Sequence, residues 1–353
     1  MDTEEIFRFP VRLSVKTPVD LIAAVPYLVG FHPENCVIAL GTDGHEGSVD
    51  FASGCGPLTG AVDDPSGLAG RLCVPFTTRS CRSAILIAYG ADELVTPCLL
   101  AARTRLRSLG VTVAEALRVT KDRYWSYECA GTDRCDPEGV PYDIHHSTIP
   151  ATAVAAGVRV RADRAEILSL TDPVTGAERE TMDRATRDAE QRCARLWGES
   201  GPTGRASLTA EGIRTVRTVV AAALNGEPPP APATVAWLGV LLVDLRTRDE
   251  AWAHIDRSRI AAHISLWSHV LRRVDTAYAA APASLLAFAA WQNDDPVLAD
   301  AALDRAVAAE PDYSMAGLVR RAVHSGLSPR DWDGFTPEWL AEQAPVADGT
   351  EAG

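Results

Sequence analysis

The sequence has few lysines, few aromatic residues and no long hydrophobic run. Only Lys16 and Lys121 are lysines among 34 basic residues, and 47 acidic residues give a formal net charge of −13. A chain this acidic is a poor candidate for a protein that gains affinity by neutralising phosphates, so we expect no nucleic-acid partner. The longest nearly apolar run, residues 234–243, has about half of the roughly 20 residues that a bilayer span needs. We therefore expect no membrane partner.

The common catalytic and cofactor signatures are also missing. The sequence contains no Gly-x-Ser-x-Gly elbow, no His-Glu-x-x-His pair and no calcium-binding loop. The glycine-rich segment 53–60 has neither dinucleotide nor P-loop spacing, and Pro57 removes a backbone donor that a phosphate-binding loop would use. A surface loop is the favoured interpretation of this segment, and we expect no cofactor.

The cysteines indicate a reducing compartment. Residues 1–5 are acidic, and no basic stretch precedes an apolar segment as it would in a secretory signal. Eight cysteines are spread along the chain, and without an export signal we expect them to be reduced thiols. Five lie among apolar or helical neighbours, where a thiol packs as a small hydrophobic group: Cys36, Cys73, Cys81, Cys98 and Cys193. We expect a cytoplasmic protein.

The first half of the chain predicts an α/β domain over residues 10–170, with a mixed or parallel sheet and flanking helices. Thr17 as a cap and Gly30 as a terminator predict a helix between them, which Pro26 is expected to kink or split. Apolar runs of strand length, together with helical patterns, predict the remaining elements. The expected strands are 36–40, 84–88, 116–119 and 124–127, and the expected helices are 66–72 and 97–109, the latter capped by Thr96.

The second half predicts an all-α domain over residues 173–340, followed by a frayed tail at 341–353. From Asp172 onward the strand patterns disappear, and alanine-, leucine- and arginine-rich helical patterns replace them. Small residues on two successive helices around the turn 293–296 resemble one tetratricopeptide-type helix pair. No second copy of this pair occurs about 34 residues upstream, the expected repeat period, so packing of an ordinary helical bundle is the alternative.

Three segments together resemble a known bacterial family. They are RYWSYEC at 123–129 with CDPEGVP at 135–141, PVDLIAAVPYLVGFHP at 18–33, and LLAFAAW at 285–291 running through 305–315. In these segments the chain resembles the family catalogued as domain of unknown function number 4192. The resemblance implies a cytoplasmic protein in two parts, α/β first and helical second, without an established activity. Where such proteins usually have Cys-Cys-Pro, this chain has Cys135-Asp136-Pro137, which argues against a shared metal role for that pair.

The candidate catalytic residues are the two cysteines of the segment 123–141 and two histidines that follow it. Cys129 and Cys135, with His145 and His146 about ten residues later, can be drawn as a zinc site, but their spacing and ligand count do not suit zinc. We expect no metal. The same residues can instead carry a nucleophile, with Arg134 favouring the Cys135 thiolate and either histidine acting as base. The structural alternative is a Gly/Pro/Asp-rich loop packed under a tryptophan.

Arginines alternate along the predicted helix 97–109. Arg103, Arg105 and Arg107 can receive an anionic ligand. Alternate positions spread around a helix, however, so a solvated surface is the favoured interpretation.

Two functional hypotheses remain. The first is a non-catalytic module that binds a protein partner or a small molecule with its helical domain and with the crevice between the domains. The alternative is a small-molecule biosynthetic enzyme with the Cys/His site in that crevice. The candidate ligand- or partner-binding residues are Trp125, Tyr127, Glu138, Trp291 and Tyr313.

Overall fold

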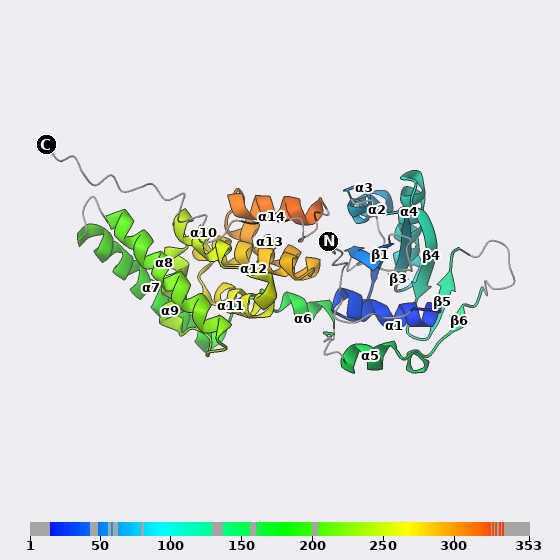
Figure 1. The fold of residues 1–353 in the computed structure, drawn as a ribbon, viewed down its shortest axis with the longest axis horizontal. Helices are drawn as coiled ribbons and strands as arrows, with labels where there is room; N and C mark the ends of the chain where they lie inside the picture. The colour runs from blue at the N-terminus through cyan, green and yellow to red at the C-terminus, as the bar shows by residue number, and fades with distance from the viewer. Residues whose placement is uncertain are drawn as a thin grey trace, which may run out of the picture. The chain divides into compact units, whose positions relative to one another are not determined.

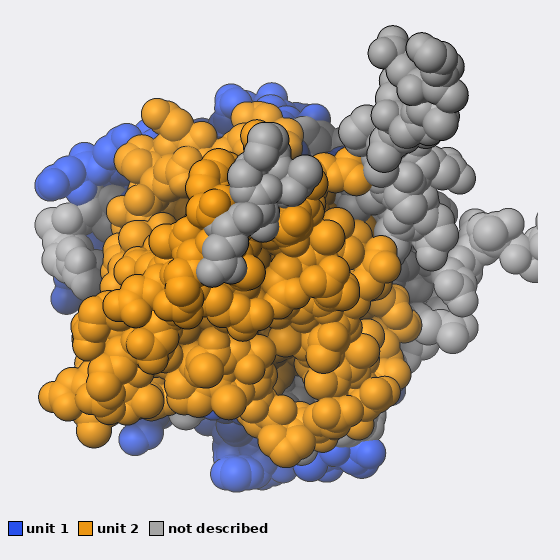
Figure 2. All heavy atoms as spheres, turned by 90° about the vertical axis from the view of Figure 1, so that its left-hand side faces the viewer, with its two compact units in different colours: residues 1–166, 324–327 blue, residues 167–323, 328–353 orange. Residues whose placement is uncertain are grey.

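The chain folds into two compact units. A computed structural model describes residues 15–42, 49–55, 58, 63–78, 81–128, 137–155, 160–161, 163–199, 204–325, 327, 329, 332 and 334. Unit 1 comprises residues 1–166 with 324–327, and unit 2 comprises residues 167–323 with 328–353 (Figure 2). Each unit buries apolar side chains of its own.

Unit 1 is a six-stranded sheet with helices on both faces (Figure 1). The strand order is β2-β1-β3-β4-β5-β6, in which β3 and β4 pair in parallel and the other neighbours pair antiparallel. The predicted α/β class, with its mixed sheet, is confirmed. The strands are β1 (Cys36–Thr42), β2 (Val49–Cys55), β3 (Ser83–Tyr89), β4 (Thr112–Val119), β5 (Arg123–Ser126) and β6 (Val140–Pro141). The helices are α1 (Pro18–Val29), α2 (Pro65–Leu72), α3 (Pro75–Thr78), α4 (Asp92–Ser108), α5 (Ile149–Ala155) and the 3-10 helix η1 (Ile144–His146).

The central strands of unit 1 are apolar on both sides because helices cover both faces of the sheet. Ile38 and Leu40 of β1 pack in one core with α1. Val37 and Ala39, which point to the opposite face, pack in a second core with α2 and α4. All seven residues of β1 are buried, as expected for a strand enclosed between two helical layers.

Helix α1 begins and ends where its sequence predicts. The Thr17 side chain accepts a hydrogen bond from the Asp20 backbone N–H at 3.1 Å, and Gly30 ends the helix with a left-handed φ of 83°. The expected split at Pro26 is wrong, because a single helix runs from Pro18 to Val29. A proline removes only one intrahelical donor, and burial of residues 21–26, with the following residues 27–29 half-buried, keeps the helix continuous.

Helix α4 begins earlier than its sequence predicts. Thr96 is not its cap, because the helix starts at Asp92. The Thr96 hydroxyl donates instead to the Asp92 carboxylate one turn earlier, at 2.9 Å. Gly90 forms the turn between β3 and α4 with a φ of 143°, and a Cβ at this position would lie 2.9 Å from Val95. This tight turn starts the helix directly after the strand and places Pro97 inside it.

In the described part of unit 2, every regular element is a helix. The short α6 (Arg164–Leu168) spans the boundary between the units. Unit 2 contains α7 (Gly176–Glu199), α8 (Gly204–Leu224), α9 (Pro232–Leu241), α10 (Leu245–Ala253), η3 (Arg257–Arg259), α11 (Ile260–Arg273), η4 (Thr276–Tyr278), α12 (Ala280–Gln292), α13 (Pro296–Ala309) and α14 (Ser314–His324). None of the helices that the structure describes is both long and apolar enough to cross a membrane.

Helix α12 is the central helix of unit 2. Every residue from Ala280 to Gln292 is buried, as expected for a helix that is apolar on all sides. It packs against both α11 and α13. Asp294 adopts a positive φ of 55° in the turn after α12, and the Asp295 side chain caps α13 by accepting from the Leu298 N–H at 3.0 Å.

Candidate functional site

Two of the predicted binding residues, Trp125 and Tyr127, lie at one corner of unit 1. Arg118 of β4 pairs with Trp125 of β5, and its guanidinium carbon lies 3.5 Å from the centroid of the indole ring. Arg118 Nε also lies 3.1 Å from the Asp92 carboxylate, which accepts a hydrogen bond of 3.2 Å from the Tyr127 hydroxyl. Asp92 therefore contacts both Arg118, which lies over Trp125, and Tyr127.

The β5 strand also holds the Pro-Glu-Gly turn, through Trp125 and Arg123. Trp125 Nε1 donates to the Pro137 carbonyl at 3.1 Å, and Arg123 Nη1 donates to the carbonyls of Glu138 and Gly139 at 2.9 and 2.7 Å. The Glu138 side chain itself is exposed. A Cβ on Gly139 would lie 2.5 Å from the indole of Trp125. The turn therefore uses the ring of Trp125 as packing surface.

This contact predicts a local stability effect at Gly139. Gly139 and Gly110 both have a positive φ, of 77° and 78°, but only Gly139 faces a side chain, whereas nothing lies within 4 Å of Gly110. We expect Gly110→Ala to cost about 1–2 kcal/mol for the left-handed backbone. Gly139→Ala should cost about 1–3 kcal/mol more, because the methyl group collides with Trp125. Chemical denaturation of the two variants measures the difference, and equal losses would contradict the packing of the turn on the indole.

Two of the arginines of α4 bind a carboxylate of the chain itself. Arg103 Nε lies 2.8 Å from one oxygen of Glu128, and Arg107 Nη2 lies 2.5 Å from the other. These two arginines are one helical turn apart and share a face of α4. The anion that they hold is therefore Glu128, directly after β5 and Tyr127.

The candidate catalytic residues are not brought into a described site. Cys129 and Cys135 lie outside the described residues. His145 and His146 lie on η1 and are exposed, and the Asp143 side chain caps this turn by accepting a hydrogen bond from the His145 backbone N–H at 2.9 Å. No group of three or more His, Cys, Asp or Glu side chains among the described residues could hold a metal ion. No disulfide joins two of the described cysteines.

The remaining predicted binding residues, Trp291 and Tyr313, are packed within unit 2. Trp291 is 5% exposed, and its ring centroid lies 5.6 Å from that of Phe288. Tyr313 is half-buried, and the Arg248 guanidinium lies 5.7 Å from its ring centroid. Burial raises the pKa of the Tyr313 phenol. These positions place both aromatic groups in side-chain packing rather than on open surface.

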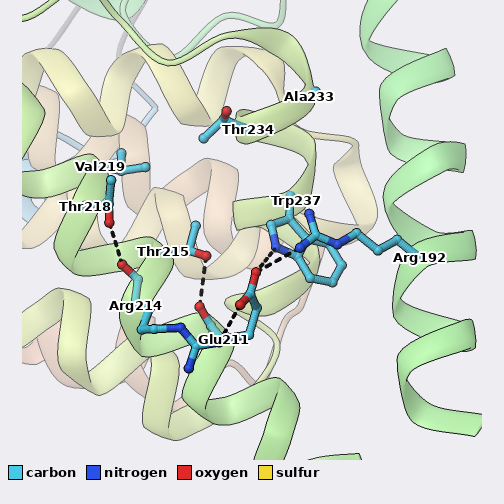
Figure 3. A pocket seen from close by; sticks show the side chains of 9 residues that line it. All are labelled: Arg192, Glu211, Arg214, Thr215, Thr218, Val219, Ala233, Thr234 and Trp237. Atoms are coloured by element: carbon cyan, nitrogen blue, oxygen red, sulfur yellow. Dashed lines mark hydrogen bonds and ion pairs between the residues drawn. The ribbon is translucent and has the colours of Figure 1, made fainter. Parts of the chain in front are cut away.

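A hollow of about 460 Å³ opens between α7, α8 and α9 of unit 2 (Figure 3). Its charged residues are Arg192 of α7 and Glu211 and Arg214 of α8. One oxygen of Glu211 lies 2.9 Å from Arg192 Nη2, and the other lies 2.6 Å from Arg214 Nη2. The hollow thus has two guanidinium groups, one at each oxygen of a single carboxylate.

Trp237 of α9 fixes this ionic cluster in place. Figure 3 shows the Arg192 side chain reaching from α7 across the indole, with the guanidinium carbon 4.1 Å from the ring centroid. Trp237 Nε1 donates, at 3.4 Å, to the Glu211 oxygen that contacts Arg192. The hydrogen bond from Arg214 lowers the pKa of the Glu211 carboxyl, with a smaller contribution from Trp237. Glu211 is therefore ionised at neutral pH, and the lining has one net positive charge.

Apart from Thr234 of α9, the rest of the lining is apolar or has its hydroxyl hydrogen-bonded within helix α8. The hydroxyls of Thr215 and Thr218 donate to backbone carbonyls one turn earlier, both at 2.9 Å. Val219, Ala233 and Thr234 complete the wall. The two guanidinium groups, whose side chains are 48% and 66% exposed, are thus the principal groups through which a ligand can be bound.

No local pattern in the sequence distinguishes these residues. Arg192, Glu211 and Trp237 are separated by 19 and 26 positions and lie on three helices. Glu211 and Arg214, three residues apart on α8, are the local part of the cluster. An acidic–basic pair at this spacing is common on any exposed helix face, so it does not distinguish a site.

Comparison with known proteins gives a family but no activity. The family model described as "Domain of unknown function (DUF4192)" matches residues 18–330. No curated protein and no solved structure matches the chain.

Proposed function

Because the chain belongs to the family described as domain of unknown function (DUF4192), whose description names no reaction, we propose its function from the geometry of unit 2. The protein acts as a non-catalytic binding protein that takes up a small anionic ligand in the hollow between α7, α8 and α9. One observation carries this proposal: two exposed guanidinium groups, held in place by a tryptophan and a glutamate, border a hollow of about 460 Å³.

The two arginines suit an anion because their donors are positioned in advance. Guanidinium groups match the geometry of carboxylate and phosphate oxygens. The Trp237 ring and the Glu211 carboxylate both hold Arg192, so less side-chain entropy is lost when a ligand binds. Each guanidinium contacts Glu211 through one Nη atom. A guanidinium has five N–H donors in all. Donors therefore remain for a second anion.

The size of the hollow and the charge of the whole chain favour a small ligand. A volume of about 460 Å³ falls within the range of roughly 300–1,000 Å³ typical of small-molecule sites. The formal net charge of −13 repels an acidic macromolecule at long range. A small ligand with one charge experiences much less of this repulsion and can be bound by the local positive charge.

The helix pair α12–α13 supports a binding role as a scaffold. Ala287 of α12 and Ala302 of α13 are both 0% exposed, and small residues of this kind allow close helix approach, as in tetratricopeptide-type pairs.

We place the protein in the cytoplasm, because Cys36, Cys73 and Cys98 are buried in apolar surroundings and suit a reducing compartment.

The proposal is tested by fluorine NMR of the protein labelled with 5-fluorotryptophan. The chain has eight tryptophans, and loss of one resonance in Trp237→Phe assigns the signal beside the hollow. At constant ionic strength, sodium butanoate and inorganic phosphate should each be titrated, with butylammonium chloride as the cationic probe. We expect at least one anion to shift the Trp237 resonance saturably and the cation to leave it in place.

A double variant shows whether the two arginines bind the anion. Arg192→Gln with Arg214→Gln should weaken binding about tenfold or more, because it removes both charge-assisted contacts. The matched control changes Arg187 and Arg195 to Gln, two exposed arginines of α7 that do not line the hollow. A Trp237 signal unmoved by either anion, or equal binding in the two double variants, would contradict the proposal.

A further inference from the structure

We infer that the ligand of this hollow is a carboxylic acid with a single negative charge and a short apolar chain, and that Glu211 discriminates against ligands with two negative charges. The inference rests on the proposed function and adds the chemical class of the ligand. It follows from the charge of the lining, from the position of Glu211 between the arginines and from the apolar wall.

The charge of the lining is balanced by one negative charge. Arg192 and Arg214 supply two positive charges, and Glu211 supplies one negative charge. A ligand with one carboxylate therefore neutralises the hollow, whereas a second carboxylate finds no unbalanced positive charge there and is exposed to the negative charge of Glu211. Like charges a few ångströms apart repel even in a water-like environment.

Glu211 holds a negative charge next to the two guanidinium groups that bind the ligand. Its two oxygens contact the two guanidinium groups separately, at 2.9 Å for Arg192 and 2.6 Å for Arg214. An anion that reaches either arginine therefore approaches the Glu211 carboxylate as well. Because the Glu211 side chain is 25% exposed, solvent screens its charge only in part.

The wall of the hollow suits a short hydrocarbon chain. Val219 and Ala233 line it, and Trp237 lies beside the charged groups. The hydroxyls of Thr215 and Thr218 donate to their own helix, so these two groups have no hydrogen left to donate to a ligand. A chain of a few carbon atoms, with its carboxylate at the arginines, covers this apolar surface.

Two five-carbon acids test the inference directly. Pentanoate and glutarate differ in the second carboxylate, and both can be titrated against the Trp237 fluorine signal. We expect wild-type protein to bind pentanoate about fivefold more tightly than glutarate, the effect of one like charge near contact in a water-like environment. Glu211→Gln, which keeps the shape of the side chain and removes its charge, should abolish or reverse this preference.

A second pair of variants keeps the test decisive if Glu211→Gln fails to fold. Thr218 lies on the lining, and Thr218→Glu adds a negative charge, whereas Thr218→Gln adds a similar volume without charge. We expect Thr218→Glu to bind pentanoate about fivefold more weakly than Thr218→Gln. Equal pentanoate affinities in this pair would overturn the inference, as would an unchanged ratio of pentanoate to glutarate in folded Glu211→Gln.

The two possible failures are distinguishable. If pentanoate, glutarate and phosphate all leave the Trp237 signal unmoved, the proposed function fails together with this inference. If anions bind through Arg192 and Arg214 but glutarate binds as tightly as pentanoate, only the inference is overturned. Pentanol serves as the uncharged probe, and pentanol binding as tight as that of pentanoate would refute the role of the charge.

Discussion

Trp267→Ala is expected to lower the free energy of unfolding by about 3–5 kcal/mol, as measured by chemical denaturation. Trp267 of α11 is 0% exposed and is among the largest fully buried side chains of the protein. Removing the indole leaves a cavity that the surrounding helices can fill only in part. The loss amounts to a large share of the stability of an ordinary domain.

Trp197→Ala provides the matched control for this substitution. Trp197 lies near the end of α7 and is 56% exposed, so we expect its loss to change stability by less than about 0.5 kcal/mol. The same chemical change is thus compared at a buried and an exposed position. A loss of less than about 1 kcal/mol in Trp267→Ala would contradict the packing of α11 in the core of unit 2.

Acidification is expected to destabilise unit 2 through His263. The His263 ring is 1% exposed, and burial lowers its pKa from 6.5 to about 4. Between these two values the unfolded chain binds a proton that the folded chain excludes. Stability is therefore full above about pH 6.5 and falls as the pH is lowered toward 4, by up to about 3 kcal/mol for this residue.

His263→Gln isolates this contribution. His263 Nε2 faces the Asp256 backbone N–H at 3.3 Å, and a glutamine can offer an oxygen acceptor at this position without titrating. We expect the stability of this variant to vary less with pH, so that wild type loses about 3 kcal/mol relative to it from about pH 7 to about pH 4. Parallel stability curves for the two proteins would show that His263 is not held neutral by burial.

Local patterns in the sequence were sufficient to predict much of the fold. Thr17 and Gly30 mark the ends of α1 because a cap and a left-handed terminator act on neighbouring backbone groups. The runs at 36–40 and 84–88 correspond to β1 and β3, since a strand covered on both faces needs continuous apolar sequence. The predicted turn at 293–296 is confirmed, because α12 ends at Gln292 and α13 begins at Pro296.

Features that depend on tertiary contacts could not be derived from local patterns in the sequence. The start of α4 at Asp92 is set by the tight turn at Gly90. No side-chain cap marks this start, because the residue before Asp92 is an alanine. The aromatic character of Trp291 attracts attention in the sequence, yet its burial follows from packing against Phe288. An aromatic residue on a helix serves equally well in a core or at a surface, so the sequence alone does not distinguish the two.

The hollow in unit 2 was not predicted for a related reason. Arg192, Glu211 and Trp237 meet only after α7, α8 and α9 have packed together. Each residue taken alone is ordinary in an amphipathic helix. Their joint geometry, and with it the proposed ligand chemistry, is visible only in three dimensions.

A crystal structure of the protein grown with pentanoate shows where this ligand binds. We predict that the pentanoate carboxylate contacts the guanidinium groups of Arg192 and Arg214, with its carbon chain against Val219 and Ala233 of the hollow. A structure in which pentanoate at saturating concentration leaves this hollow empty, or binds only elsewhere on the chain, would contradict the account.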